Sequence, residues 1–127
     1  MTTKSRATVN VSIDVPDLDA GVDFYHRAFG WQERSRPLPH MAVLDGNNVM
    51  VCIHAKDEGS KPTPTDQTRG YSRHWTPVHL DLHVEDFDGT VAKVVEAGAS
   101  IEQTHSKPKA VAFCSDPFGN GFCVIGP

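Results

Sequence analysis

The strongest constraint on the fold of this chain is an internal repeat. Residues 10–22 and residues 79–91 follow one pattern, in which Val15 matches Val84 and Asp17 matches Asp86, 69 positions apart (84 − 15). Each copy alternates polar and apolar residues, reaches an aspartate and then changes to helical spacing, which is typical of a strand followed by a capped helix. The repeat therefore predicts two paired modules with a ligand cavity where they meet.

The length and charge of the chain limit the classes of partner. With 127 residues the chain can bury a core, whereas each half alone would be marginal. The formal net charge is −4 and no block of lysine or arginine occurs, so we expect no nucleic-acid partner. No apolar run approaches the ~20 residues of a membrane span, and residues 1–7 lack the apolar stretch of a signal peptide. We therefore expect no membrane association.

The cysteines indicate a reducing compartment. Cys52, Cys114 and Cys123 are an odd number without C-x-x-C spacing, and each falls inside a predicted strand. Three reduced, buried thiols in a cytoplasmic protein are the simplest interpretation.

The first module is predicted to span residues 8–55 with the order β-α-β-β-β. Alternation predicts a strand over residues 9–15, Asp17 caps a helix over residues 18–29, and Gly30 ends it. Three further strands are predicted over residues 31–36, 40–45 and 49–54.

A linker and a second module complete the chain. Residues 56–77 are rich in Lys, Asp, Gly, Pro and Thr without periodicity, which indicates a long connection. The second module, residues 78–127, repeats the order of the first. It has a strand over residues 78–84, a helix after Asp86 that ends at Gly98, and strands over residues 100–105, 110–115 and 121–125. The predicted core stripe of that helix is Phe87, Val91, Val94 and Val95.

Three segments resemble the vicinal oxygen chelate superfamily, which includes glyoxalases, bleomycin resistance proteins and extradiol dioxygenases. They are V-P-D-L-D-A-G-V-D-F-Y-H-R-A-F-G-W at residues 15–31, H-L-D-L-H-V-E-D-F-D at residues 79–88, and D-P-F-G-N-G-F-C-V-I at residues 116–125. The resemblance implies an α+β fold in which two paired βαβββ modules form a curled mixed sheet, shaped like a cup, with the helices outside. It also implies a homodimer.

The resemblance further implies where metal-dependent members carry their ligands. Those positions hold Asn10, Met50, His79 and Cys123, with Met50 matched to Cys123 by aligning their turns, and only His79 fits the usual ligand set. An amide, a thioether, one imidazole and one thiol suit a soft ion such as Cu(I) better than Fe²⁺, Mg²⁺ or Mn²⁺. We therefore predict a protein without a metal or other cofactor.

Strand alternation predicts the two faces of the sheets. The face away from the cup should pack on the helices and is apolar, as in Ile13, Val51 and Val124. Trp31, His40, Trp75 and Phe113 could close the rim, although both tryptophans could instead pack at sheet edges. The predicted ligand-binding residues on the cup face are Asn10, Ser12, Met50, Cys52, His79, Asp81 and Cys123.

A cup with soft and aromatic walls and few polar groups suits an organic molecule of moderate size. The leading hypothesis is metal-independent binding of a hydrophobic or aromatic small molecule, which resembles sequestration by bleomycin-resistance-type proteins. The alternative is a glyoxalase-like lyase or isomerase, or a dioxygenase-related enzyme. In it His79 would act as a base beside Asp81, as a metal ligand, or as the partner of a Cys123 nucleophile. A third reading is a module whose dimer surface is its function. The sequence leaves open whether the modules pair within one chain or between chains.

Overall fold

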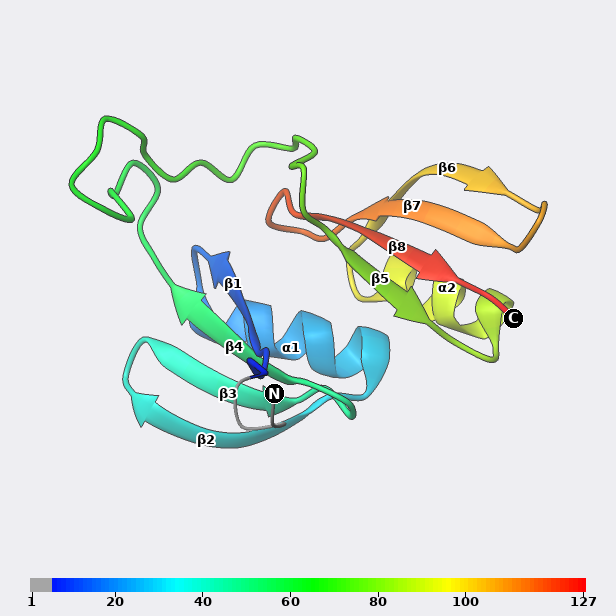
Figure 1. The fold of residues 1–127 in the computed structure, drawn as a ribbon, viewed down its shortest axis with the longest axis horizontal. Helices are drawn as coiled ribbons and strands as arrows, with labels where there is room; N and C mark the ends of the chain where they lie inside the picture. The colour runs from blue at the N-terminus through cyan, green and yellow to red at the C-terminus, as the bar shows by residue number, and fades with distance from the viewer. Residues whose placement is uncertain (1–5) are drawn as a thin grey trace.

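The computed structural model describes residues 6–127. It contains two β-α-β-β-β modules that lie side by side (Figure 1). The prediction that no signal peptide is present rests on residues 1–7, most of which lie outside the described residues. None of the described helices is both long and apolar enough to span a bilayer.

The first module is a four-stranded sheet with one helix. In chain order its elements are β1 (Val11–Val15), α1 (Leu18–Phe29), β2 (Gln32–Leu38), β3 (Met41–Asp45) and β4 (Met50–Ala55). The sheet order is β1-β4-β3-β2, with β1 parallel to β4 and the other pairs antiparallel. Asp17 accepts a hydrogen bond from the backbone N–H of Asp19 at the start of α1. Gly30, at φ 74°, ends the helix in the left-handed conformation.

The second module has the same topology. Its elements are β5 (Leu80–His83), α2 (Phe87–Glu96), β6 (Ser100–His105), β7 (Val111–Ser115) and β8 (Gly121–Ile125), in the sheet order β5-β8-β7-β6. The parallel pair is again the first and last strand of the module. The predicted α+β architecture of two β-α-β-β-β modules is confirmed.

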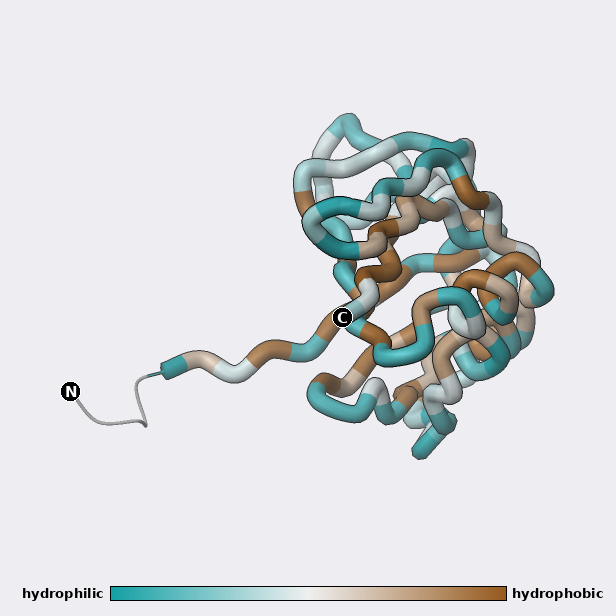
Figure 2. The backbone as a smooth tube through the Cα atoms, turned by 90° about the vertical axis from the view of Figure 1, so that its right-hand side faces the viewer, coloured by the Kyte–Doolittle hydropathy of each residue, from teal (hydrophilic) through white to brown (hydrophobic). Residues whose placement is uncertain are grey.

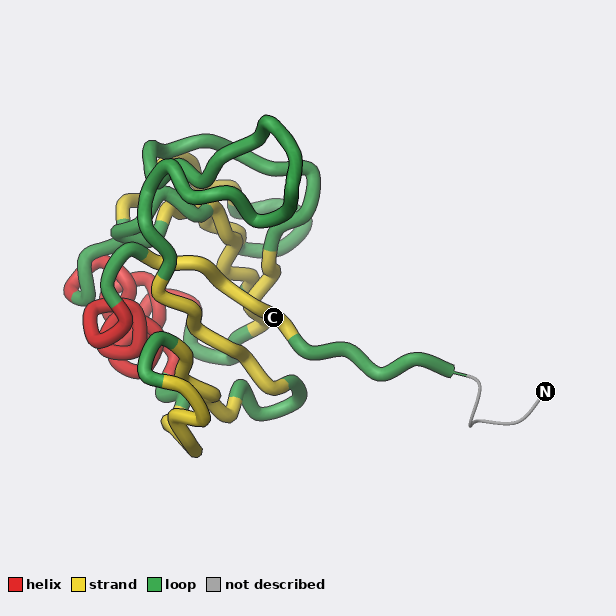
Figure 3. The backbone as a smooth tube through the Cα atoms, turned by 90° about the vertical axis from the view of Figure 1, so that its left-hand side faces the viewer, coloured by secondary structure: helices red, strands yellow, loops and turns green. Residues whose placement is uncertain are grey.

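The core lies between the sheets and the two helices, which pack against each other on one side of the strands (Figure 3). The face predicted to pack on the helices does so: Ile13, Val51 and Val124 are all buried there. Within the first helix, Phe24 is almost fully buried at the centre of the aromatic cluster. Conversely, Val95 was predicted to lie in the core and is half exposed. It lies eight residues after Phe87, at the flank of the buried stripe.

The first strand of each module begins two residues later than predicted. Val9 and Val78 are 75% and 83% exposed, and the stretch leading into β1 extends away from the body of the protein (Figure 2). The reason is the extent of the parallel partner strand. Because β4 begins only at Met50, the β1 ladder starts with the pair Val11 and Val51.

The connection over residues 56–79 contains no helix or strand, and it is fixed to the first module. Arg69 Nε donates to Asp14 Oδ2 at 2.8 Å, and the backbone N–H of Gly59 donates to the carbonyl of Arg69. Tyr71 Oη donates to the carbonyl of Lys56 at 2.7 Å. These bonds close the segment into a compact loop, so it cannot act as a slack tether.

The turn before β8 joins the two modules. Asp116 is buried, and its Oδ1 accepts from the backbone N–H groups of Phe118 and Asn120. Its Oδ2 accepts from Asn120 Nδ2 and, at 2.5 Å, from the hydroxyl of Tyr25 in α1. Burial, followed by the Asp116 charge, raises the pKa of Tyr25 above its ordinary value, so the phenol stays protonated as the donor. The turn at residues 116–120 is therefore also the hydrogen-bonded link to the first helix.

Candidate functional site

Three of the predicted ligand-binding residues come together in the second module. Asp81 on β5 lies directly opposite Cys123 on the neighbouring parallel strand β8. His79 lies two residues earlier on the same face, and its Nδ1 is 3.1 Å from Asp81 Oδ1. One potential ligand atom from each of the three residues lies within 4.8 Å of the others. The structure thus groups an imidazole, a carboxylate and a thiol at one point.

Cys123 is the buried member of this group. Burial raises the pKa of Cys123 to about 11, and the nearby charge of Asp81 adds to the increase. The side chain is therefore a protonated thiol at neutral pH and a poor nucleophile. All three cysteines are buried and free, as predicted.

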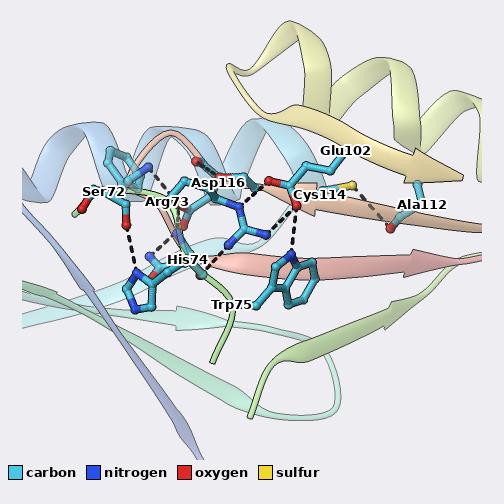
Figure 4. Close-up of polar contacts among 11 residues, drawn as sticks. Ser72, Arg73, His74, Trp75, Glu102, Ala112, Cys114 and Asp116 are labelled. Carbon is cyan, nitrogen blue, oxygen red and sulfur yellow. Dashed lines mark hydrogen bonds and ion pairs between the residues drawn. The ribbon is translucent and has the colours of Figure 1, made fainter. Parts of the chain in front are cut away.

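An aromatic corner adjoins this group. We define it as Trp75, His79 and Phe113. The Trp75 ring meets the other two rings edge to face, with centroid distances of 5.3 and 5.9 Å. Although Trp75 is 40% exposed, its indole Nε1 donates to Glu102 Oε1 at 3.0 Å (Figure 4). An exposed tryptophan held in one orientation is an unusual surface feature.

Arg73 reinforces that orientation. Its guanidinium lies 4.6 Å from the centre of the Trp75 ring and makes two hydrogen bonds to Glu102, at 2.5 and 2.6 Å. These bonds hold the pKa of Glu102 below its ordinary value, so the carboxylate remains charged as an acceptor. The ring also requires Gly121, because a Cβ atom there would lie 2.9 Å from the indole Cε3. Sequence reasoning missed Arg73, Glu102 and Gly121, since nothing in their spacing indicates a shared partner.

The other predicted site residues lie on the first module. Asn10 Nδ2 lies 3.8 Å from Cys52 Sγ, and Ser12 is paired in register with Cys52. Met50 is exposed. The registers also correct the predicted match of Met50 to Cys123. Since Ser12 and Asp81 are 69 positions apart, their cross-strand partners show that Cys52 is the counterpart of Cys123.

Two cavities lie between the modules, and both are lined by Val11 and Leu80. The smaller has a volume of about 310 Å³ and includes Ser12 and His79, with the buried Tyr25 in its wall. The larger has a volume of about 730 Å³ and includes Asp81. Neither of these two cavities among the described residues is lined by all of the predicted residues.

The predicted rim residues also separate. The prediction that Trp31 closes the rim is wrong. Its side chain is 8% exposed and stacks on Tyr25 in the core at a centroid distance of 5.6 Å. His40 lies in the exposed turn between β2 and β3. Only Trp75 and Phe113 lie beside the cluster of His79, Asp81 and Cys123.

The sequence profile of the glyoxalase-like domain matches residues 10–125. The chain belongs to this glyoxalase-like domain family. The match spans both modules, and it confirms the resemblance to the vicinal oxygen chelate superfamily. Among curated protein sequences, none matches this chain significantly.

Solved structures share the fold of this glyoxalase-like domain at low sequence identity. A hypothetical protein from S. aureus is 23% identical, with a TM-score of 0.75 over 94% of this chain and 93% of that one. The fosfomycin resistance protein FosX from Listeria monocytogenes, in a complex with Mn(II) and 1S,2S-dihydroxypropylphosphonic acid, is 14% identical, with a TM-score of 0.73 over 100% and 93%. Lactoylglutathione lyase from Agrobacterium tumefaciens is 16% identical, with a TM-score of 0.64 over 95% and 94%.

Proposed function

We propose that this glyoxalase-like domain binds an organic small molecule with a planar or aromatic group on the cup face of its second module. The observation that carries the proposal is the aromatic corner, where Trp75 is exposed and yet fixed by Glu102, Arg73 and two ring contacts. A ring held in position before binding loses little conformational freedom when a ligand stacks on it. Tryptophan is also one of the side chains enriched among the residues that contribute most binding energy at interfaces.

Two polar side chains at the edge of the aromatic corner can orient a bound ligand. His79 and Asp81 have side chains that are 33% and 46% exposed, and their 3.1 Å contact fixes the imidazole ring. They offer hydrogen bonds to a polar substituent of the ligand at the edge of the aromatic corner. A mixed apolar and polar surface of this kind favours a drug-like aromatic molecule over a simple aliphatic one.

The Mn(II) of the FosX complex does not fit the donors of this chain. Mn²⁺ prefers carboxylate and water oxygens. The positions that the resemblance assigns to metal ligands supply the Asn10 amide, the His79 imidazole and the Cys123 thiol instead. Antibiotic sequestration without a manganese centre, of the bleomycin-resistance type, is therefore the form of binding that we propose.

Binding of bleomycin and mitomycin C tests the proposal, with calorimetry and tryptophan fluorescence as readouts in the presence of EDTA. We expect at least one to bind and to quench Trp75, while the buried Trp31 supplies a constant background. Removing a central tryptophan typically costs at least about 2 kcal/mol of binding free energy, so Trp75→Ala should weaken binding roughly 30-fold. Val95→Ala is the matched control, since Val95 is exposed on the outer helix α2.

Two results would contradict this proposal. One is the absence of heat and of fluorescence change with both compounds and with a panel of aromatic antibiotics. The other is equal affinity of the wild type and Trp75→Ala, which would move the ligand away from the aromatic corner.

A second candidate function is a lyase or isomerase, and the contact between His79 and Asp81 favours it. A carboxylate that holds one ring nitrogen leaves the other nitrogen of His79 directed elsewhere, as in many general bases. Turnover of lactoylglutathione or of fosfomycin, lost in His79→Gln with unchanged thermal stability, would support this candidate. No turnover of either compound would favour the binding protein.

We also propose that the protein is a homodimer. Leu38 and Met50 are exposed apolar residues on the first module, and Val78 is exposed in the connection, two residues before β5 of the second. Exposed apolar groups along both modules are what a second copy would cover. Light scattering after size-exclusion chromatography should give twice the 13.9 kDa chain mass, and a monomer at all concentrations would contradict the dimer. Cytoplasmic location stays a prediction from the reduced cysteines.

A further inference from the structure

The cluster of His79, Asp81 and Cys123 has a chemical character that small-molecule stacking does not use. Cys123 is buried and therefore has one fixed position, whereas the His79 and Asp81 side chains are partly exposed and can adjust. Asp81 contributes because the parallel register places it directly opposite Cys123. Asp81 is not among the positions at which the resemblance places the family's ligands, which are Asn10, Met50, His79 and Cys123.

We propose that His79, Asp81 and Cys123 together bind a thiophilic divalent ion of the zinc type, and that they select it against Mn²⁺ and Mg²⁺. Nitrogen, carboxylate oxygen and thiolate sulfur are the three ligand types that zinc uses in proteins. Hard ions prefer sites made only of oxygen, or of oxygen and water, and a thiolate disfavours them.

The geometry is within reach of a tetrahedral site. Zinc–ligand bonds of about 2.0–2.3 Å place neighbouring ligand atoms roughly 3.3–3.6 Å apart. The three ligand atoms already lie within 4.8 Å of one another, so side-chain rotations of His79 and Asp81 suffice and the backbone need not move. The 3.1 Å contact between His79 and Asp81 shows that two of the three are already at coordination spacing.

The charges of the cluster also suit a dication. Without an ion, the Cys123 thiol keeps its proton opposite the Asp81 carboxylate, and binding of an ion releases that proton. A doubly charged ion between the resulting thiolate and the carboxylate makes two attractive contacts. Three protein ligands leave the fourth coordination position open, as in zinc sites that bind a small molecule or water.

The first module contains a natural control. Cys52 is the register counterpart of Cys123 and is buried in the same way, but the residue opposite it is Ser12 instead of an aspartate. The described neighbours of Cys52 therefore do not include the carboxylate that completes the second-module cluster. Cys52→Ala and Cys123→Ala remove the same atoms from equivalent positions, and only the second should abolish ion binding.

The experiment uses the full chain, stripped with a chelator and titrated with Co²⁺, which reports sulfur coordination through a near-ultraviolet charge-transfer band. We expect one Co²⁺ per chain, displacement by one equivalent of Zn²⁺, and no displacement by equimolar Mn²⁺. Cys123→Ala should lose the band and Cys52→Ala should keep it. Asp81→Asn should weaken binding at least about tenfold, the smallest loss typical even of a supporting partner.

Three results would overturn the inference: no band in the folded wild type, equal loss of the band in both cysteine variants, or displacement of Co²⁺ by Mn²⁺. Since Asp81 is partly exposed, Asp81→Asn keeps the test decisive if Cys123→Ala does not fold. The inference does not depend on the proposed organic ligand. If the organic ligand binds in EDTA and Co²⁺ gives no charge-transfer band, the inferred ion site is refuted and the proposed function stands.

Discussion

The hydrogen bond from Tyr25 to Asp116 gives the sharpest stability prediction, because it links the two modules through buried atoms. Tyr25→Phe keeps the ring that stacks on Trp31 and removes only the hydroxyl, which donates to Asp116 Oδ2 at 2.5 Å. Hydrogen bonds to charged groups contribute about 1.5–3 kcal/mol. Asp116 keeps three other donors, so its charge is not left unpaired.

We therefore expect the free energy of unfolding to fall by about 2 kcal/mol. For a chain of this length each kcal/mol lowers Tm by about 3–5 °C, which gives a decrease of roughly 6–10 °C. Urea unfolding at pH 7, followed by circular dichroism and by tryptophan fluorescence, measures the change, and coincident curves verify two-state behaviour.

Tyr71→Phe is the matched control for this measurement. The Tyr71 hydroxyl donates to the uncharged carbonyl of Lys56 in a partly exposed loop, so its loss should cost less than about 1 kcal/mol. A loss below about 0.5 kcal/mol in Tyr25→Phe would refute the reasoning. An equal loss of unfolding free energy in both variants would also refute it, because the buried bond to Asp116 would then contribute no more than the exposed bond of Tyr71.

Three further predictions concern the aromatic corner and the thiols. Gly121→Ala places a methyl group against the Trp75 ring, so the fluorescence of Trp75 should shift to longer wavelength, whereas Gly70→Ala, which meets no atom within 4 Å, should leave the spectrum unchanged. The pKa of Glu102 is lowered by its hydrogen bonds to Arg73, so this contribution to stability is present above the ordinary pKa of 4.5 and is lost only as the pH falls through the lower folded value. An acid titration should therefore release Trp75 below pH 4.5, and Glu102→Gln should abolish that transition. Burial raises the pKa of Cys114 from 9.0 to about 12, so the wild type should lose stability as the pH rises from 9 towards 12, and Cys114→Ala should lose less in a series of urea titrations.

Much of the fold could be predicted from sequence, because periodicity is a local property. The predicted bounds of the first helix and of the strands β6 and β8 agree with the structure, since alternation, caps and turns lie within each segment. The first strands of both modules were extended too far over Val9 and Val78. Alternation continues there, but the parallel partner strand has not yet begun.

The candidate site could be predicted only in part. Parity put His79, Asp81 and Cys123 on one face correctly, yet it gave no sign that Asp81 and Cys123 are direct neighbours. Trp75 lies in the connection between modules, where no period operates, and its orientation depends on Glu102 from another strand. Contacts of this type depend on how distant segments fold back on one another, which no local pattern records.

The sequence by itself determined the duplicated modules and the apolar face that packs on the helices. These features follow from residue order alone, because side-chain direction alternates along a strand and repeats along a helix. Only the tertiary structure decided that Cys52 is the counterpart of Cys123, that Trp31 belongs to the core and that Trp75 is locked at the surface. Strand register and long-range hydrogen bonds settle such questions, since both depend on pairing between segments far apart in the chain.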